Sequence, residues 1–427
     1  MTLSPIAVRP LTSDAELDLH CQAADQAFSS NPSPENARRW KQVLTAQPGY
    51  RPETIRGVFR DGEQMGSYII YERLLRMGEA QIATGCIGAV VTYPAYRKAG
   101  VATALMLDAI DYAQSHNYSL LLLDGIPKFY YRYGYIDMFD VSAQDIDYSA
   151  ILAFPASPYT VRPATPDDAE AMLALYDRHC GPYTGSFVRS LETQRFRIQN
   201  RSSENPHWLA LDPSGVVRGY LTIGFGAPGS QAQEMAADDW SAMVALLQHH
   251  ARLLEGPEKP AFLTYRLPPT GSALQSLIDG LEVPDTSHWD HPSMEWGVRG
   301  HTYHHRFAGW MSRLIRLSTL AHSLLPEWQA RWQRSLVSWS GDIQLLVGEE
   351  MCTLRIDGDE LSLIAGPGIA SDTVQLTPQQ FIQVLFGYRP IATFLRHSEQ
   401  PAPADLLTVL NVLFPMGHTW IPASDWF

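Results

Sequence analysis

The sequence predicts an α/β protein with mixed α+β sheets, in which two copies of one fold stand in tandem and a smaller α+β domain follows. A repeat carries the first part of this prediction, because Val8–Glu16 and Val161–Glu170 read almost alike. The second copy starts 153 residues after the first (161 against 8), which is the size of one domain. The α/β class is predicted by short apolar runs typical of strands, which alternate along the chain with segments of helical apolar spacing. We expect domains at residues 1–150, 151–300 and 301–427.

Each copy of the repeat ends a strand and begins a helix. Both contain a Thr/Ser/Asp cap followed by acidic residues in the first helical turn. We expect a hairpin next in each copy. In the first copy, Thr54–Phe59 and Met65–Arg73 flank Asp61-Gly62, and in the second copy Trp208–Leu211 and Val216–Ile223 flank Asp212–Gly215.

A strand, a sharp turn and a helix start follow one another after Cys86. The run Cys86–Val91 is short and apolar like a buried strand, and after Gly100 apolar residues recur at helical spacing. The first turn of a helix leaves N–H groups unpaired, and Gly100 and Ala102 carry too little side chain to keep a phosphate away from them. Arg97 and Lys98 add positive charge beside these amides. The turn therefore predicts a site for the diphosphate of a nucleotide.

A second motif, Phe129–Tyr135, comes after an apolar strand, Leu120–Leu123, and the turn Asp124–Pro127. Together the two motifs closely resemble those of the GNAT acyltransferase superfamily, V-x-P-x-x-[RQ]-x-x-G-x-[GA] and then F-Y-x-x-[FY]-G-[FY]. Taken singly, Gly100 could be an ordinary helix-start glycine and the tyrosines could be core. The resemblance implies acetyl-CoA as co-substrate, bound through Val90, Val91, Thr92, Arg97, Lys98, Ala99, Gly100, Val101, Ala102 and Thr103.

The resemblance also implies how the reaction would run. In GNAT proteins the end of this strand splays from its neighbour, so its free backbone amides bind the pantetheine arm and polarise the thioester carbonyl. The tyrosine of the second motif donates a proton to the leaving sulfur, and Tyr130 is the matching residue here. Tyr131 is the alternative, because the doublet allows a register shifted by one residue.

The second copy of the fold lacks the phosphate motif. Between Phe225 and the helical run Asp239–Leu254 the chain reads Gly226-Ala227-Pro228-Gly229-Ser230-Gln231-Ala232-Gln233, with no Arg-x-x-Gly-x-Ala. We therefore expect no acyl-CoA there.

The last part of the chain follows Pro292–Glu295 and predicts a Trp-rich helix at Ser318–Trp332, three strands with Gly/Asp turns, and a helix at Pro378–Leu385. The segments Leu376–Phe381 and Phe386–Pro390 resemble the sterol-carrier-protein-like C-terminal domain of the enhanced-intracellular-survival acetyltransferases. In that family tandem GNAT folds precede this domain, and the resemblance covers the whole chain. It implies aminoglycosides or lysine side chains as substrates and a hexamer as the assembly.

The general base is the unusual part of this resemblance. GNAT enzymes often use a glutamate that acts through water, but no carboxylate of the first copy stands at an obvious place for it. In the resembled family the α-carboxylate of an aromatic C-terminal residue accepts the amine proton, and this sequence finishes with Trp426-Phe427. An α-carboxyl group is ionised at neutral pH and can take a proton directly or through a water. The alternative is an apolar tail that only patches the core.

Acidic and aromatic residues suggest where a cationic amine would bind. The early helices of the first copy offer Asp25, Phe28 and Trp40, and the tail adds Asp425 and Trp426. The alternative is that Phe28 and Trp40 belong to the core and that Asp25 faces water.

Composition narrows the class of partner. The 45 acidic residues against 32 basic ones, a net charge of -13, argue against nucleic acid and suit a cationic substrate or simple solubility. The start Met1–Ile6 has no secretion signal, and no segment is long and apolar enough to span a bilayer. We expect a cytoplasmic protein with no membrane partner.

The sequence predicts no metal site. Its four cysteines, Cys21, Cys86, Cys180 and Cys352, are scattered, and His301-x-x-His304-His305 has no third ligand nearby. The resulting hypothesis is an acetyl-CoA-dependent N-acetyltransferase that acts on primary amines, aminoglycoside-, polyamine- or lysine-like, by direct attack in a ternary complex. The alternatives are a lipid carrier and a non-catalytic acyl-CoA sensor.

Overall fold

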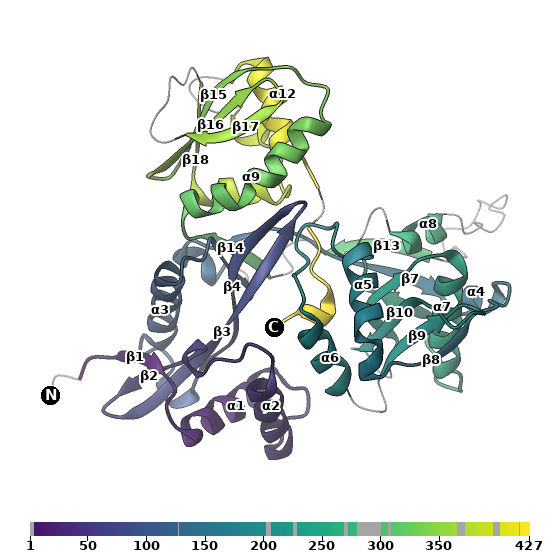
Figure 1. Cartoon of the computed structure of the whole chain (residues 1–427). Helices are drawn as coiled ribbons and strands as arrows, with labels where there is room; N and C mark the ends of the chain where they lie inside the picture. The colour runs from purple at the N-terminus through teal and green to yellow at the C-terminus, as the bar shows by residue number, and fades with distance from the viewer. Residues whose placement is uncertain are drawn as a thin grey trace, which may run out of the picture. The chain divides into compact units, whose positions relative to one another are not determined.

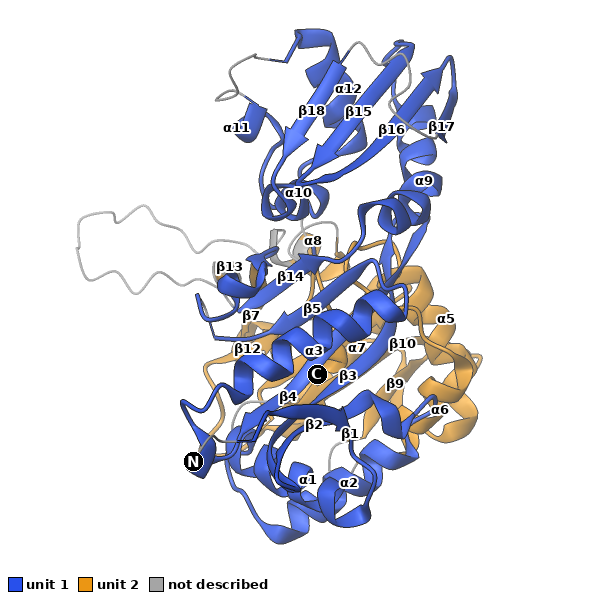
Figure 2. Ribbon diagram, turned by 90° about the vertical axis from the view of Figure 1, so that its left-hand side faces the viewer, with its two compact units in different colours: residues 1–139, 307–419, 427 blue, residues 140–306, 420–426 orange. Residues whose placement is uncertain are grey.

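The computed structural model describes residues 4–126, 128–201, 206–224, 229–268, 272–279, 300–305, 309–364, 372–395, 402–417 and 419–427. The chain forms two compact units (Figure 2). Unit 1 comprises residues 1–139, 307–419 and 427, and unit 2 comprises residues 140–306 and 420–426. No helix among these described residues is long and apolar enough to cross a membrane.

A seven-stranded mixed sheet forms the first part of unit 1 (Figure 1). Its central pair, β4 and β5, is parallel, and every other neighbouring pair is antiparallel. The strand order is β1 (Ala7–Pro10), β2 (Ile55–Arg60), β3 (Glu63–Met77), β4 (Ala80–Thr92), β5 (Leu120–Asp124), β14 (Trp310–Leu314) and β6 (Ile136–Asp137).

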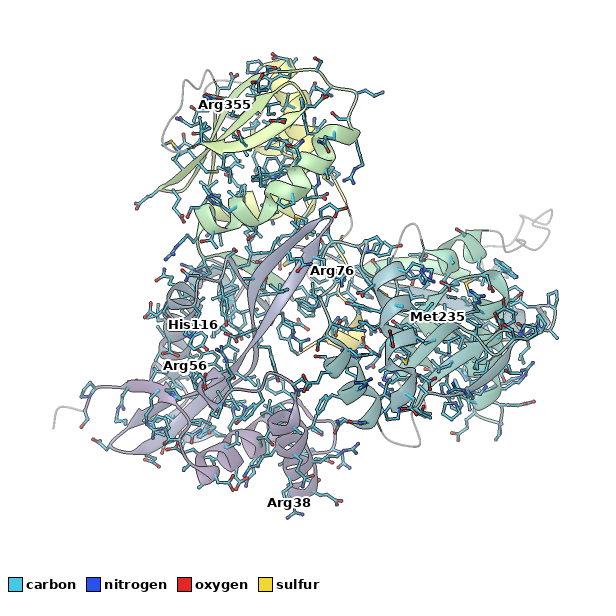
Figure 3. All side chains as sticks on the ribbon, viewed as in Figure 1. Arg38, Arg56, Arg76, His116, Met235 and Arg355 are labelled. Carbon is cyan, nitrogen blue, oxygen red and sulfur yellow. The ribbon has the colours of Figure 1, made fainter. Side chains whose placement is uncertain are left out.

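Helices cover both faces of this sheet. On one face α1 (Asp14–Phe28) and α2 (Pro34–Ala46) bury Leu17 and Leu44 against β2 and β3. On the other face α3 (Val101–Ser115) packs its apolar stripe on alternate residues of the strands. Arg56 of β2, labelled in Figure 3, ties the sheet to α3 because its Nη2 donates to Asp108 at 2.8 Å.

The rest of unit 1 contains a four-stranded sheet with helices. In it, β15 pairs antiparallel with β16 and parallel with β18. Glu327 of α9 accepts a hydrogen bond from the Glu79 amide at 2.9 Å and so caps the β3–β4 turn. The elements are α9 (Leu317–Arg334), β15 (Gly341–Val347), β16 (Glu350–Asp357), β17 (Glu360–Ile364), β18 (Asp372–Leu376), α10 (Pro378–Leu385), α11 (Ala392–Leu395) and α12 (Ala404–Leu413).

Unit 2 contains a second seven-stranded sheet of the same design. Its single parallel pair, β11 and β12, lies at the same place in the strand order as β4 and β5 do in the first sheet. The order is β8 (Thr160–Pro163), β9 (His207–Leu211), β10 (Val217–Gly224), β11 (Gln231–Ala237), β12 (Phe262–Tyr265), β7 (Val141–Asp147) and β13 (Gly300–His305). The helices are α4 (Tyr148–Ala153), α5 (Ala169–His179), α6 (Leu191–Gln199), α7 (Trp240–Leu253) and α8 (Ala273–Asp279).

The predicted fold class is confirmed, since the sheets are mixed and their repeated order is consistent with tandem folds. One strand of each sheet comes from an unexpected part of the chain. β7 precedes the second repeat in sequence but pairs within the second sheet, and β14 follows that repeat but pairs within the first. The predicted limits at 150 and 300 stay predictions. Pro292–Glu295 lies outside the described residues.

A buried cluster of four charges anchors the tail in unit 2. Asp425, in the turn η5 (Ala423–Asp425), accepts from Arg189 at 2.6 Å and also from Arg197. Arg189 also donates to both oxygens of Glu234, one of them at 2.9 Å. The side chains of Arg189, Glu234 and Asp425 are at most 2% exposed. Burial alone would raise the pKa of Glu234, but the two arginines outweigh it and hold that pKa below its usual value.

We expect Asp425→Asn to destabilise the protein by about 3–5 kcal/mol, because it takes the carboxylate partner from Arg197 and leaves two guanidinium groups with one buried counter-ion, Glu234. Urea unfolding monitored by tryptophan fluorescence measures this loss. The matched control is Asp167→Asn in the same unit, where the side chain is exposed, and it should change stability by about 0.5 kcal/mol or less. Equal stability of the two variants would contradict the assigned role of the cluster.

Candidate active site

Strand β4 contains a bulge next to the centre of the first sheet. Ser67 pairs with Val91 and Ile69 pairs with Gly88, so two residues of β4, Ala89 and Val90, stand opposite one residue of β3. Ala89 has a φ of 48°, in the left-handed region that a residue with a Cβ seldom adopts. A bulge of this kind re-aims the strand and leaves a backbone group out of the ladder.

On its other side β4 loses its partner at the same level. The described pairing with β5 runs from Thr84–Leu120 to Ile87–Leu123 and stops there, although β4 continues to Thr92. Within the part of the chain that the structure describes, backbone groups of residues 88–92 that point toward β5 therefore have no strand partner. Val90, Val91 and Thr92, for which the resemblance implied a splayed strand end, lie in this stretch of β4.

The predicted phosphate turn leads into α3. It consists of the short helix η2 (Pro94–Tyr96), Lys98 with a φ of 67° and Gly100 with a φ of 83°. No side chain caps α3, and a Cβ placed on Gly100 would meet nothing within 4 Å. The amides of Val101, Ala102 and Thr103 are thus left for an anion, with open space in front of the turn.

Positive charge lies beside these amides. The side chains of Arg97 and Lys98 are exposed, and in the described part of the chain neither is paired with a carboxylate. Ala99 is half-buried against the core under α3, and the Thr103 hydroxyl lies 3.0 Å from the Tyr133 hydroxyl. The turn is therefore built from a packed side that fixes it and an open side that carries the charges.

Tyr130 begins the short helix η3 (Tyr130–Tyr133) and is buried, with 7% of its surface exposed. Its ring packs on Gly125 and lies edge-on to Phe129 at 4.9 Å between centroids. Burial raises the pKa of Tyr130, and Tyr133 and Asp124 act in the same direction, so the hydroxyl stays protonated. Tyr131 instead donates its hydrogen bond to Asp137, which favours Tyr130 as the free proton donor.

Phe427 lies in unit 1, on the face of the sheet opposite α3. Its ring centroid is 5.4 Å from that of Trp310 and 6.1 Å from that of Tyr71. Its main-chain carboxyl carbon is 3.2 Å from the position that a Cβ on Gly88 would take. The last carboxyl group of the sequence is therefore next to β4 where its pairing with β5 ends. The sequence around Gly88 gave no sign that Phe427 would lie beside it, because the two residues are far apart in the chain.

Asp25, Phe28 and Trp40, three of the predicted substrate residues, lie on α1 and α2 of unit 1, and Trp426 lies in unit 2. Asp25 accepts a hydrogen bond from the Ser33 amide at 2.7 Å and so fastens the loop between α1 and α2. Phe28 is 65% exposed, whereas Trp40 stacks on His20 at 5.7 Å and packs against the core. Trp426 donates its indole N–H to the Ile421 carbonyl at 3.2 Å.

Asp425 is accounted for by its arginine partners. Its buried carboxylate already accepts hydrogen bonds from Arg189 and Arg197, which favours an anchoring role over the predicted binding of a cationic substrate. Of the five predicted substrate residues, only Phe28 exposes most of its side chain.

A buried polar cluster beside the bulge was missed by the sequence analysis. His20 Nδ1 lies 2.8 Å from the Ser67 hydroxyl, which is 3.4 Å from the Tyr93 hydroxyl, and Gln64 donates to Tyr93 at 2.7 Å. His20 is fully buried, and this burial lowers its pKa to about 4. The cluster holds α1 against β3 and the start of the phosphate turn through neutral groups.

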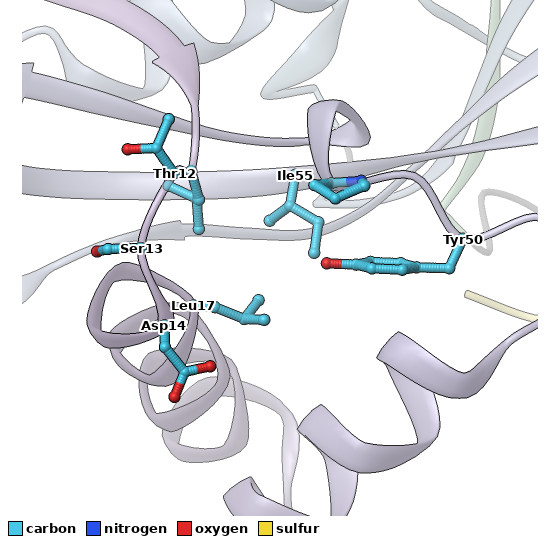
Figure 4. A pocket seen from close by; sticks show the side chains of 8 residues that line it. Thr12, Ser13, Asp14, Leu17, Tyr50 and Ile55 are labelled. Atoms are coloured by element: carbon cyan, nitrogen blue, oxygen red, sulfur yellow. The ribbon is translucent and has the colours of Figure 1, made fainter.

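A hollow of about 160 Å³ lies at the start of α1 (Figure 4). It is lined by Leu11, Thr12, Ser13, Asp14, Leu17, Tyr50, Pro52 and Ile55. The Ser13 hydroxyl and the Glu16 carboxylate already satisfy the helix start in a capping box. The hollow belongs to a different part of the sheet from the bulge and carries none of the groups described above.

In the described residues no group of three or more His, Cys, Asp or Glu side chains could hold a metal ion. The side chains of His301 and His304 lie outside what the structure describes, as do residues 225–228 of the loop where the second copy lacks the phosphate motif.

Comparison with known families assigns the first part of the chain. Residues 7–136 match the family described as acetyltransferase (GNAT) domain, and these residues contain the bulge, the phosphate turn and Tyr130. The first part of the chain is therefore similar to a GNAT acetyltransferase domain. No curated protein matches the sequence.

Solved structures share the fold over the whole chain. A probable N-acyltransferase of unknown function from Enterococcus faecalis has a TM-score of 0.73 at 16% identity, covering 99% of this chain and 100% of its own. A GCN5-related N-acetyltransferase from Kribbella flavida has a TM-score of 0.70 at 17% identity, covering 100% and 99%. Eis1 from Mycobacterium abscessus has a TM-score of 0.61 at 14% identity, covering 99% and 100%.

The His20 cluster makes stability depend on pH. The unfolded chain protonates this histidine below its usual pKa of 6.5, whereas the folded protein does so only near pH 4. Stability should therefore fall by at most about 3 kcal/mol between pH 6.5 and 4, and His20→Gln should remove that part of the fall. Urea unfolding at pH 7 and 4.5 measures the difference. The exposed His322→Gln serves as control, and an equal pH dependence of both variants would refute the assignment.

Proposed function

We propose that the protein is an acetyl-CoA-dependent N-acetyltransferase that acts on primary amines by direct attack in a ternary complex. One observation carries the proposal, and it concerns the described residues. There β4 is bulged on the side of β3 and has no strand partner on the side of β5, directly before an uncapped helix start with two cations that no carboxylate pairs. Such an arrangement offers backbone donors to a thioester and its amide-bearing arm, and then to a diphosphate.

The acetyl-CoA would lie along the open edge of β4. Its diphosphate would accept hydrogen bonds from the amides at Val101–Thr103, with Arg97 and Lys98 supplying full charge. Its pantetheine arm would pair with the backbone of residues 88–92, which replaces the missing strand partner. The thioester carbonyl would then face an amide at the bulge, which stabilises the oxyanion that forms during attack.

The chemistry needs three proton transfers. The amine nitrogen attacks the thioester carbon, the carbon–sulfur bond breaks, and the thiolate takes the proton of the Tyr130 hydroxyl. The nitrogen loses a further proton as it becomes the amide, and this proton restores the Tyr130 hydroxyl, directly or through a water. The attacking ammonium group must first lose a proton, and the Phe427 carboxylate is our choice for the acceptor. The position of its carboxyl carbon next to Gly88 supports this choice, because Gly88 is the first residue of β4 that no longer pairs with β5. A glutamate acting through water is the alternative base.

The proposed acceptor is a small cationic amine, aminoglycoside-, polyamine- or lysine-like. The acidic net charge supports a cation over a nucleic acid or an anionic membrane surface. The sequence resemblance to the enhanced-intracellular-survival family, with the full-length likeness to Eis1, supports three further proposals. These are a sterol-carrier-protein-like C-terminal domain, a hexameric assembly and a cytoplasmic location.

Thiol release with a panel of amines tests the proposed function. We expect CoA to form from acetyl-CoA with at least one primary amine and to stay at background without an amine. Tight binding of acetyl-CoA with no turnover across the panel would favour an acyl-CoA sensor instead. Lipid extracted from the purified protein, together with no turnover, would favour a carrier.

Tyr130→Phe should lower kcat by about 100-fold or more while the Kd of acetyl-CoA stays unchanged, because the ring keeps its packing and loses its proton. Steady-state kinetics and calorimetry give the two readouts. Tyr131→Phe is the matched control and should stay within about threefold of the native kcat. If the control loses activity and Tyr130→Phe does not, Tyr131 is the acid.

One glycine added after Phe427 should lower kcat by about 100-fold, because it moves the carboxylate by one residue and leaves the side chains unchanged. Gly88→Ala should act in the same direction, since its Cβ would crowd the Phe427 carboxyl carbon at 3.2 Å and Tyr71 at 3.1 Å. A glycine added before Met1 is the control. Normal turnover by the extended tail would move the base to a glutamate that acts through water.

A further inference from the structure

Asp124 is the last residue of β5 and lies where β4 and β5 part. The parallel register ends with Ile87 opposite Leu123, so the next residues along the two strands, Gly88 and Asp124, stand at the same level. On the other edge of β5, Asp124 pairs with Trp310 of β14. Asp124 therefore has Gly88 on one side and Trp310 on the other.

The side chain of Asp124 lies on the face opposite α3. Leu121 and Leu123 belong to the core under α3, and side chains alternate along a strand, so Leu122 and Asp124 point to the other face. Phe427 lies on that same face, because its ring contacts Trp310 and its carboxyl carbon is next to Gly88. Both lateral neighbours of Asp124 thus contact Phe427. Two carboxyl groups share one face at the level where the strands separate.

The surroundings of Asp124 suit a binding role rather than a structural one. Part of its side chain is exposed, and among the described residues no lysine or arginine forms an ion pair with it. The loop before β14 is held by a main-chain bond, from the Gly125 amide to the Gly309 carbonyl at 2.9 Å, and Asp124 Oδ1 packs against Gly309, in the space that a Cβ there would take. Burial of its surroundings nevertheless raises the pKa of Asp124 to about 6.

We propose that Asp124 is a second carboxylate of the acceptor site and binds the ammonium form of the amine before that amine is deprotonated. The inference rests on the proposed function and gives the substrate class as an amine that is charged at neutral pH. The ammonium group would donate hydrogen bonds to Asp124 and pass one proton to the Phe427 carboxylate. The neutral nitrogen would then attack the thioester and lose its second proton to the Tyr130 oxygen, which has protonated the leaving thiolate, and Asp124 would leave the cycle unchanged.

This role predicts a lower limit of working pH. Asp124 must be ionised to attract the ammonium group, so kcat/KM for a charged amine should fall as the pH drops through about 6. Among the described residues, Tyr130 is the titratable group whose pKa is raised by Asp124, and Phe427 lies on the same face of the sheet as Asp124. Burial raises the pKa of Tyr130, so its hydroxyl stays neutral throughout this range.

Asp124→Asn provides the test, with two amines that differ in charge. One is a primary alkylamine, which is an ammonium ion at pH 7.5, and the other is an aromatic amine, which is neutral there. For the alkylamine KM should rise by about 10- to 100-fold and the fall below pH 6 should disappear. For the aromatic amine KM should change by about threefold or less, because no charge-assisted bond is lost. The Kd of acetyl-CoA should stay unchanged.

Two variants complete the experiment. Asp111→Asn removes an exposed carboxylate from α3, on the other face of the sheet, and should behave like the native protein with both amines. Asp124→Glu keeps the charge and should recover part of the loss. An unchanged KM in Asp124→Asn, or an equal rise for both amines, would overturn the assignment.

A binding measurement distinguishes failure of the proposed function from failure of the inference about Asp124. Calorimetry with the same alkylamine in the presence of CoA needs no turnover. Weaker binding by Asp124→Asn than by the native protein supports the inference even if no amine is acetylated. Equal binding by both proteins overturns it whatever the turnover.

Discussion

The candidate site depends on the last five residues of β4, which no longer form hydrogen-bonded pairs with β5. Backbone N–H and C=O groups inside a protein need partners, and those of residues 88–92 on the side of β5 have none from a strand. The bulge at Ala89 and Val90 keeps β4 bound to β3 while turning its other edge outward. A ligand that runs along this edge therefore completes the sheet, and the helix start after Gly100 continues the same row of donors.

The local part of this arrangement could be predicted because short-range physics sets it. The apolar strand, Gly100 and the apolar stripe of α3 follow one another in sequence. Glycine at a φ of 83° explains the turn between strand and helix without reference to the rest of the chain. The bulge could not be predicted, since Ala89 takes a positive φ that its residue type disfavours. Only the pairing of β4 with β3, set by the whole hairpin, holds Ala89 in that conformation.

Long-range pairing also limited the prediction of the fold. The repeat at Val8 and Val161 correctly implied two sheets of one design, but β7 and β14 each occupy the sheet that their sequence neighbourhood did not suggest. A short amphipathic strand pairs wherever an edge of matching register is available, and no local signal records which edge that is. The contact of Phe427 with Gly88 and Trp310 is of the same kind, because it joins the end of the chain to strands far from it in sequence.

Carboxylates show most directly why residue type alone does not give a role. Asp425 was predicted to bind a cation, yet two arginines from α6 and the loop before it surround its carboxylate, so its charge stabilises the fold of unit 2. Asp124 carried no such prediction, because in sequence it is the first residue of a turn. In the structure it stands on the face that carries Phe427, with no described cation paired to it. A protein cation beside a buried carboxylate gives that carboxylate a structural role, whereas a carboxylate such as Asp124, with no cation paired to it in the described residues, is available to an external cation.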